Sequence, residues 1–280
     1  MDFPIRIPLR IWIDTAVFYV TAQYADFFDA VSELVQRQLN AFERILLWPP
    51  WWAIVIVVTL IAWRLAGRWM GVFTAAGLLL ILSLGLWRET MGTLALVLAA
   101  TMLSILLGVP LGILAARSKV VYQVLQPLLD LMQTMPSFVY LIPTLLLFGM
   151  GRVPAVFATV VFGMPPAVRL TRLGIMQVPE EVIEAGRSFG ATPLQMLLDI
   201  QLPIALPTIM AGINQTILLA LSMVVIAGMI GAGGLGRTVL NGITQVKPGI
   251  GFEGGISIVI LAIILDRITQ TIGHTKKDFN

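Results

Sequence analysis

The chain alternates between long apolar runs and short polar stretches. Seven runs contain no Asp, Glu, Lys, Arg or His, and they cover residues 45–63, 69–87, 90–116, 131–151, 153–168, 200–236 and 254–265. A helix needs about 20 apolar residues to cross the hydrocarbon core of a bilayer. The pattern therefore predicts seven transmembrane helices, near residues 50–66, 69–87, 90–115, 136–150, 153–169, 207–230 and 255–273.

Composition also indicates a membrane protein. Hydrophobic residues make up 58% of the chain and charged residues 12%, with a mean hydropathy of +0.92. Soluble domains carry about 25% charged residues, so this chain has more apolar surface than a soluble core could bury. Helices are required because lipid offers no hydrogen-bond partners to an open sheet edge. We expect a polytopic, all-α integral membrane protein.

Residue types that usually carry catalysis or bind metals are scarce. The chain has no cysteine and one histidine, His274, which excludes disulfides, thiolate sites and a multi-histidine metal site. No G-x-x-x-x-G-K-[ST] motif occurs, so the sequence has no phosphate-binding loop for ATP. Residues 231–236 match G-x-G-x-x-G but follow an apolar helix rather than a strand, which favours a flexible turn over dinucleotide binding. We predict no catalytic residue, metal site or bound cofactor, and the lack of a basic stripe argues against nucleic acid.

Basic residues predict the orientation in the membrane. If the polar segment around Glu184 is cytoplasmic, the inside segments hold Arg64, Arg68, Arg117, Lys119, Arg169, Arg172, Arg187, Arg267, Lys276 and Lys277. The outside connections after the first span hold only Arg88, Arg152, Arg237 and Lys247. This asymmetry agrees with the positive-inside rule. We therefore place the N-terminus outside the membrane and residues 274–280 as a tail in the cytoplasm.

Residues 1–48 are predicted to form an external tail, followed by two accessory transmembrane helices in residues 49–87. Within the tail, apolar side chains recur at spacings of three and four, at Phe28, Val31, Val35, Leu39, Phe42 and Leu46. This spacing predicts an amphipathic helix that lies in the outer membrane interface. Docking on another protein is the alternative.

Residues 171–206 are the only long stretch after the tail that mixes charge, proline and glycine. Pro179, followed by two acidic residues, predicts a helix start, and Gly190 permits the left-handed turn that ends a helix. Residues 192–193, Thr-Pro, predict the cap and first turn of a second helix, which we expect to end at Pro203. Loops of this length are uncommon unless they are functional. We predict an ordered projection between two spans.

A family resemblance rests on this projection. It reads E-A-G-x-x-x-G from Glu184 to Gly190 and, after nine further residues, I-x-L-P at 200–203. This resembles the pattern by which permease subunits of ATP-driven (ABC-type) importers contact a separate ATPase subunit. Similarity to the glycine betaine/proline betaine/choline branch of these permeases extends over residues 133–143, 203–216, 220–230 and 263–267. Gly186 departs from the family pattern, which usually has alanine there.

The resemblance implies a five-helix permease core over residues 88–273, with residues 171–206 as its cytoplasmic coupling loop. It implies a second, identical permease copy, two copies of an ATPase subunit that binds ATP and Mg²⁺, and an external substrate-binding protein. The lipid bilayer, which the resemblance implies is a bacterial inner membrane, is the remaining partner. The residues assigned to ATPase coupling are Glu184, Ala185, Gly186, Gly190, Ile200, Leu202 and Pro203.

The same resemblance implies a quaternary-amine compatible solute as cargo: choline, glycine betaine or proline betaine, imported for osmoprotection. Aromatic faces attract such cations through cation–π interactions. The candidate pathway residues are Phe138, Tyr140, Phe148, Asn214, Ser222 and Met223. The alternative for the aromatic residues is packing or lipid contact. Asp266 and Arg267 are interpreted as anchors near the inner interface, and Asp130 fits either the pathway or the interface.

Other function classes remain open at this level. An ion-coupled secondary transporter would need buried carboxylates or histidines and an inverted hydropathy repeat, and neither is evident. A non-transporting scaffold of a larger complex is a second rival. Within the importer class, an amino acid is the alternative cargo.

Overall fold

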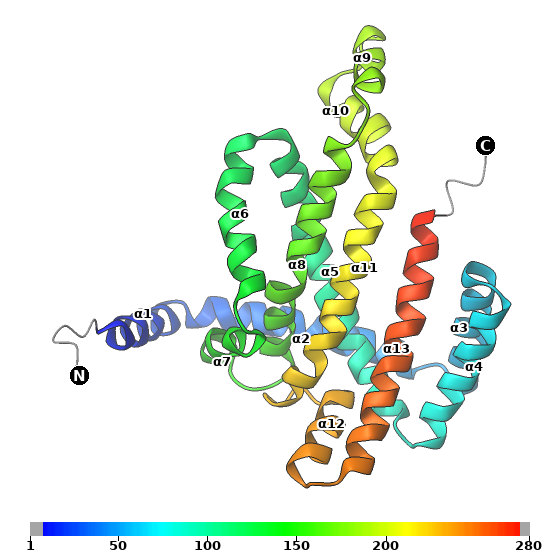
Figure 1. Ribbon diagram of the computed structural model, residues 1–280. Coiled ribbons are helices and arrows are strands. Elements are labelled where there is room, and N and C mark those ends of the chain that lie inside the picture. The colour runs from blue at the N-terminus through cyan, green and yellow to red at the C-terminus, as the bar shows by residue number, and fades with distance from the viewer. Residues whose placement is uncertain (1–7, 275–280) are drawn as a thin grey trace, which may run out of the picture.

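The computed structural model describes residues 8–274, and every regular element in that range is helical (Figure 1). The N-terminal elements are α1 (Leu9–Gln23), α2 (Ala25–Leu47), α3 (Trp51–Ala66) and α4 (Arg68–Ser83). The central elements are α5 (Trp87–Arg117), α6 (Lys119–Thr134), the 3₁₀ turn η1 (Ser137–Tyr140), α7 (Leu141–Phe148) and α8 (Arg152–Met176). The C-terminal elements are α9 (Glu180–Ser188), α10 (Pro193–Gln195), the π-helix η2 (Met196–Gln201), α11 (Leu202–Gly228), α12 (Gly234–Thr244) and α13 (Pro248–His274). The predicted all-α class is confirmed.

Three helices form the centre of the molecule. α5, α8 and α11 pack along one another, with α6 and α13 on either side (Figure 1). Small residues allow this close approach: a Cβ atom at Gly112 of α5 would lie 2.6 Å from Thr171 Cβ of α8, and one at Gly212 of α11 would lie 2.9 Å from Leu170 Cβ. Such contacts are typical of helices in membranes, where association depends on van der Waals fit.

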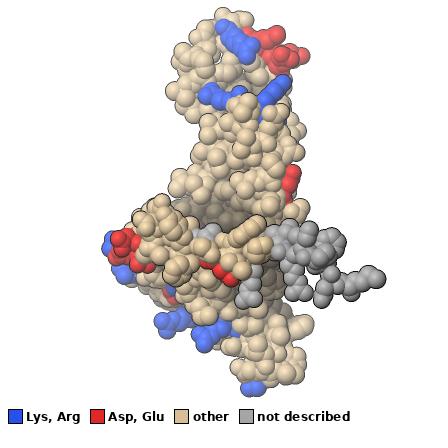
Figure 2. Space-filling model, turned by 90° about the vertical axis from the view of Figure 1, so that its left-hand side faces the viewer, with Lys and Arg blue, Asp and Glu red and all other residues tan. Residues whose placement is uncertain are grey.

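Four helices are long and apolar enough to span a membrane by themselves: α5, α8, the continuous helix Pro193–Gly228, and α13. The pair α2 with α3, and the pair α6 with η1 and α7, meet the same criteria only together, and they bend by 93° and 110° at their breaks. α4 is a shorter apolar helix. Charged residues gather on the tip formed by α9 and α10 and around the level of α2, with mostly uncharged surface between them (Figure 2).

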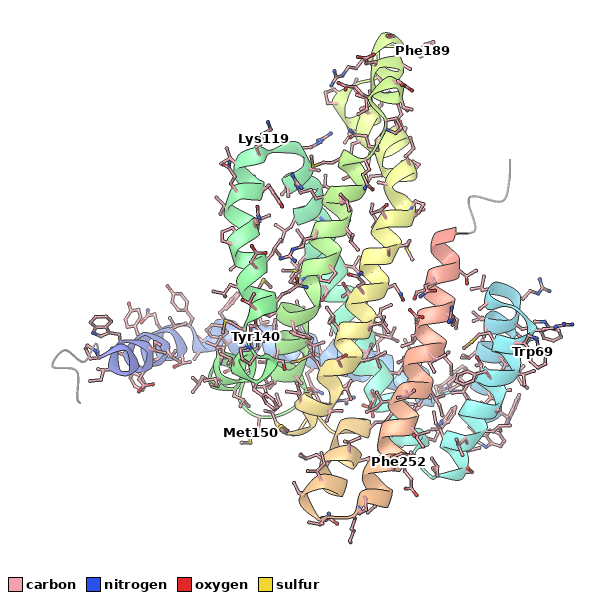
Figure 3. The ribbon with its side chains drawn as sticks, viewed as in Figure 1. Trp69, Lys119, Tyr140, Met150, Phe189 and Phe252 are labelled. Carbon is pink, nitrogen blue, oxygen red and sulfur yellow. The ribbon has the colours of Figure 1, made fainter. Side chains whose placement is uncertain are left out.

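The two ends of the bundle carry different connections. Lys119 and Phe189 lie toward one end, and Met150 and Phe252 lie toward the other (Figure 3). The connection between α5 and α6 therefore shares an end with α9, as the distribution of basic residues predicted. Which end faces the cytoplasm stays a prediction, and the predicted tail beyond His274 lies outside the described residues.

The fourth predicted span, at 136–150, is wrong. This segment forms η1 and the eight-residue α7, folded back by 110° from α6. The helix that runs along the bundle here is α6, which the pattern missed because Asp130 and three glutamines interrupt its apolar run. Ser118 caps α6, and its Oγ accepts a hydrogen bond from Val121 N at 3.3 Å. Pro136 ends the helix because the residue before a proline is pushed out of the helical region.

α2 is the amphipathic helix predicted within the tail, and its apolar stripe packs on the protein itself. Val35 and Leu39 are buried against residues of α5, α7 and α8. Arg152, at the start of α8, forms a salt bridge with Glu43, with 2.5 Å between Nη1 and Oε2. α2 is thereby fastened to the bundle. Its position in the membrane interface stays a prediction, and residues 1–7 of the tail lie outside the described range.

The glycine-rich run 231–236 forms the turn expected from its composition, with positive φ angles at Gly231, Gly233 and Gly234, and it also packs closely against α11. A Cβ atom at Gly236 would lie 2.0 Å from the carbonyl oxygen of Val224. Leu235 N donates a hydrogen bond to Thr93 Oγ1 at 2.8 Å, which fastens this segment to α5. The run also begins α12, a helix that the hydropathy pattern did not predict.

We expect Gly236→Ala to lower the thermal stability of the purified chain, because the added methyl group meets a backbone carbonyl that cannot move aside. Overpacking of this kind costs about 1–3 kcal/mol, and each kcal/mol shifts a melting temperature by about 2–4 °C in a chain of this size. The matched control is Gly255→Ala, since nothing lies within 4 Å of a Cβ atom there. Equal melting temperatures for the two variants would contradict the close packing.

Candidate functional site

The tip (residues 179–203) projects beyond the other helices at one end of the bundle (Figure 1, Figure 3). α9 begins after Pro179, and two acidic residues occupy its first turn. Their negative charges stabilise the helix because they lie near the positive end of its dipole. Gly190 has a φ angle of +77°, the left-handed conformation that the sequence predicted for the end of this helix. Ala191 N donates to Gly186 O at 3.1 Å, which closes the turn.

The second part of the tip starts with a capping box. Thr192 Oγ1 accepts a hydrogen bond from Gln195 N at 3.3 Å, and Gln195 Oε1 accepts one from Thr192 N at 2.9 Å. The helix then continues without a break from Pro193 to Gly228. The prediction that Pro203 ends the helix is therefore wrong. Proline lacks an N–H donor and its ring crowds the carbonyl four residues earlier, and the wider π-turn η2 lies directly before it.

The residues assigned to coupling divide into an outward set and an inward one. Glu184, Ala185 and Gly190 are exposed on the tip, and so is Pro203 at its base. Ile200 and Leu202 are half-buried. Phe189, which the sequence pattern did not single out, is 91% exposed at the end of α9. The sequence did contain a signal for this exposed residue, because Phe189 is an apolar residue within a charged segment and precedes the glycine that ends the helix.

Gly186 faces inward, within the tip itself. A Cβ atom there would lie 2.7 Å from Met196 Cε and 2.7 Å from Ile200 Cδ1. These atoms are the far ends of flexible side chains, so they could move to accept a methyl group. Gly186 is buried at the contact between α9 and η2, and it does not offer a surface to a partner.

The tip is joined firmly to the bundle beneath it. Leu197 of η2 is buried with Ile175 of α8 and Ile209 of α11. Arg117, at the end of α5, donates from Nη2 to Pro193 O at 2.7 Å. Helices α5, α8 and α11 thus all contact the base of the tip.

Three of the six candidate pathway residues belong to the packed interior. Tyr140 and Met223 are buried in the cluster around α8. Tyr140 also donates from its hydroxyl to Leu131 O at 3.2 Å. Phe148 stacks on Phe157, with ring centroids 4.3 Å apart and planes 5° from parallel. The aromatic residues Tyr140 and Phe148 serve packing here, as the alternative interpretation held.

The other three candidates lie on η1 and α11 and differ in their exposure. Phe138 on η1 and Ser222 on α11 are exposed. Asn214 is buried, and its Nδ2 donates to Asp266 Oδ1 at 2.7 Å while its Oδ1 accepts from the Thr269 hydroxyl. This network ties α11 to α13, which fits the interpretation of Asp266 as an anchor.

Comparison with known proteins places these features in a family. Residues 108–275 match the family model described as "Binding-protein-dependent transport system inner membrane component". The chain belongs to this family. The match covers α6, α7, α8, the tip and α11 to α13, so all of the tip described above falls within the permease core.

Two relatives match the permease along nearly its whole length. It is 51% identical over 271 residues to the glycine betaine/proline betaine transport system permease protein ProW of Escherichia coli (strain K12), which covers 97% of this chain and 77% of that protein. It is 49% identical over 277 residues to the glycine betaine transport system permease protein OpuAB of Bacillus subtilis (strain 168), which covers 99% of this chain and 98% of that protein.

A solved structure shares the fold. The MetNI methionine ABC transporter, in an inward facing conformation, matches with a TM-score of 0.60 and 22% sequence identity. The match covers 65% of this chain and 92% of that chain. The likeness supports an importer-permease fold for the core of this chain.

We expect Gly186→Leu to loosen the tip of the permease, because a larger side chain cannot fit between α9 and η2. Trypsin cleavage after Arg187 measures this, since proteolysis follows the population of locally open states. An opening that becomes easier by about 1–3 kcal/mol raises the cleavage rate about fivefold or more. The matched control is Ala185→Leu, which adds the same bulk at the neighbouring exposed position, and equal cleavage of both variants would contradict the inward position of Gly186.

Proposed function

We propose that this permease is the membrane-spanning subunit of an ATP-driven importer for a quaternary-amine solute, with glycine betaine and proline betaine as the first candidates and choline as the next. The observation that carries the proposal is the similarity over 97% and 99% of the chain to relatives named for glycine betaine transport. A similarity of this extent includes every helix that could line a pathway. The chemical class of the cargo follows from those names, and no site in the single chain contradicts it.

The tip is the proposed contact with an ATPase subunit. Glu184, Ala185 and Gly190 offer an acidic group and two small residues on its exposed surface, and Phe189 adds an apolar side chain. ATP and Mg²⁺ bind on the ATPase, because the permease sequence has no phosphate-binding loop. Closure of two ATPase subunits would draw two tips together.

Energy enters this mechanism as a shift between two arrangements of the helices. A ligand shifts such an equilibrium only through contacts that differ between the two states. The base of the tip touches α5, α8 and α11 together, so a displaced tip changes the packing of all three helices. A pathway between two permease copies would then open alternately to either side.

The remaining partners complete the proposed assembly. The second permease copy is identical, and an external binding protein delivers the cargo at the end opposite the tip. The tip and the C-terminus face the cytoplasm, and the N-terminus lies outside the inner membrane. Basic residues stay more numerous on the tip side when Arg169, which pairs with Asp130 on α6, is left out of the count, and this excess supports the orientation.

Uptake into membrane vesicles tests the proposal. The vesicles contain the permease with its ATPase and binding protein, and labelled glycine betaine and choline are supplied with and without ATP. We expect ATP-dependent uptake by the wild-type protein and a loss of about tenfold or more with Ala185→Trp, because a bulky side chain on the tip blocks a close contact. The matched control is Leu106→Trp on α5, where the native side chain is already 64% exposed.

Each outcome bears on a different part of the proposal. Uptake that ignores ATP and tolerates Ala185→Trp would overturn the importer class and favour a secondary transporter. Loss of uptake with Leu106→Trp as well would show that the effect is not specific to the tip. If the wild-type complex takes up neither solute while its binding protein still stimulates ATP hydrolysis, the proposed cargo would be wrong.

A further inference from the structure

α6 presents two exposed sides of opposite character. A polar stripe runs along one of them with spacings of three, four and three residues, formed by Gln123, Gln126, Asp130 and Gln133, all exposed. The other exposed side is apolar and is formed by Val120, Val124, Leu128 and Leu131, which are 52–69% exposed. The helix buries a third side, with Leu129 and Met132, against α8. An apolar side suits lipid, and the polar stripe requires other surroundings.

The polar stripe is linked to a charge on α8. Arg169 donates from Nη2 to Asp130 Oδ1 at 2.6 Å and from Nη1 to Gln133 Oε1 at 2.6 Å. The side chains of Arg169 and Asp130 are 37% and 55% exposed. Arg169 lies on the side of α8 away from α5, because Ala167 and Thr171 form the side that meets the glycines of α5.

This ion pair lies deep within the span. Asp130 follows Lys119 by eleven residues, about 16 Å along α6 at ~1.5 Å per residue. Arg169 follows Arg152 by seventeen residues, about 25 Å along α8. Together these distances nearly equal the ~40–45 Å thickness of a bilayer with its headgroups. With Lys119 and Arg152 placed at the two membrane surfaces, the pair would lie inside the hydrocarbon core, where charged side chains face a water-filled cavity or a protein interior and not lipid.

α11, on the other side of α8, also exposes small and polar side chains (Figure 1). Its exposed positions include the small or polar residues Ala211, Gln215 and Ser222, at helical spacings of four and seven. The side of α11 that packs on α8, with Thr208 and Thr216, lies about a quarter turn away. α6, α8 and α11 therefore form one face with polar and small side chains across the depth of the membrane.

We infer that this face lines the translocation pathway and that Asp130, Arg169 and Gln133 form a contact site for a small zwitterion. The inference rests on the proposed function and names residues that would touch its cargo. Asp130 would face the quaternary ammonium group, and Arg169, with its planar set of donors, would bind the carboxylate. Gln133 would keep Arg169 oriented between the two helices.

The chemistry of an ion pair suits a site that cargo must enter and leave. When the site is empty, Asp130 and Arg169 neutralise each other at 2.6 Å, which avoids the cost of two unpaired charges in a low-dielectric region. A zwitterion replaces that contact with two others of the same kind. Because one set of charge contacts is exchanged for another, binding is weak, and the cargo can pass on.

Cysteine labelling tests the inference, and the native chain supplies no background because it contains no cysteine. The complete transporter is placed in lipid nanodiscs, where both sides are open to a charged, membrane-impermeant thiol reagent. We expect Gln126→Cys, on the polar stripe, to react about tenfold or more faster than Val124→Cys, because thiolate formation needs water. Both positions are exposed and only two residues apart. Equal, slow labelling of the two variants would overturn the pathway face.

Cargo protection tests the site itself. Saturating glycine betaine should slow labelling of Gln126→Cys about threefold or more, since Asp130 lies one turn away, whereas the same concentration of glucose should not. We expect this protection to vanish when Arg169→Gln is added and to persist when Glu43→Gln, at the separate Arg152 salt bridge, is added instead. Fast labelling without protection, or protection that survives Arg169→Gln, would overturn the zwitterion site. These readouts need no transport, so a failure of ATP-dependent uptake remains a separate result that bears only on the proposed function.

Discussion

The close approach of α8 to its two neighbours is the contact on which the rest of the structure depends. Glycines on each helix remove the side chain that would hold the backbones apart: Gly112 of α5 meets Thr171, Gly212 of α11 meets Leu170, and Gly174 of α8 meets Thr208. In lipid, no hydrophobic effect drives helices together, so shape fit must supply the attraction. The contact also brings the end of α8 and the start of the Pro193–Gly228 helix to one point, which is where the tip stands.

A continuous helix from the tip into the membrane has a mechanical consequence. A loop with a break at Pro203 would absorb a displacement through its own backbone rotation. Here the π-turn η2 accommodates the proline while the helix runs on to Gly228, so the second part of the tip and α11 form one continuous helix. π-turns are often found at functional sites, and this one lies where Gly186 contacts Met196. In the proposed mechanism, a displacement of the tip would therefore be passed along this helix to the membrane-spanning part of α11.

Local signals in the sequence were sufficient for much of this arrangement. The helical class, the start of α9 after Pro179, the turn at Gly190 and the cap at Thr192 depend on residues close together in the chain, and these were predicted. α6 and the unbroken helix at Pro203 were not, because both depend on neighbours distant in sequence. Asp130 interrupts an apolar run only until Arg169 on α8 pairs with it. α12 was missed for a similar reason. Glycines in a sequence indicate a turn, and only the structure shows that Gly236 of α12 packs against Val224 of α11.

Two polar networks within the membrane show why position decides the role of a carboxylate. Asp266 meets Asn214, which is buried between α11 and α13, and the partners are fixed by packing on both helices. Breaking that network would leave the buried amide of Asn214 without hydrogen-bond partners, so the network holds α11 and α13 together. Asp130 pairs with Arg169 on an exposed face, where water or a zwitterionic solute can replace each residue as the contact of the other. The same side chain thus holds helices together at one place and leaves a contact open to exchange at the other.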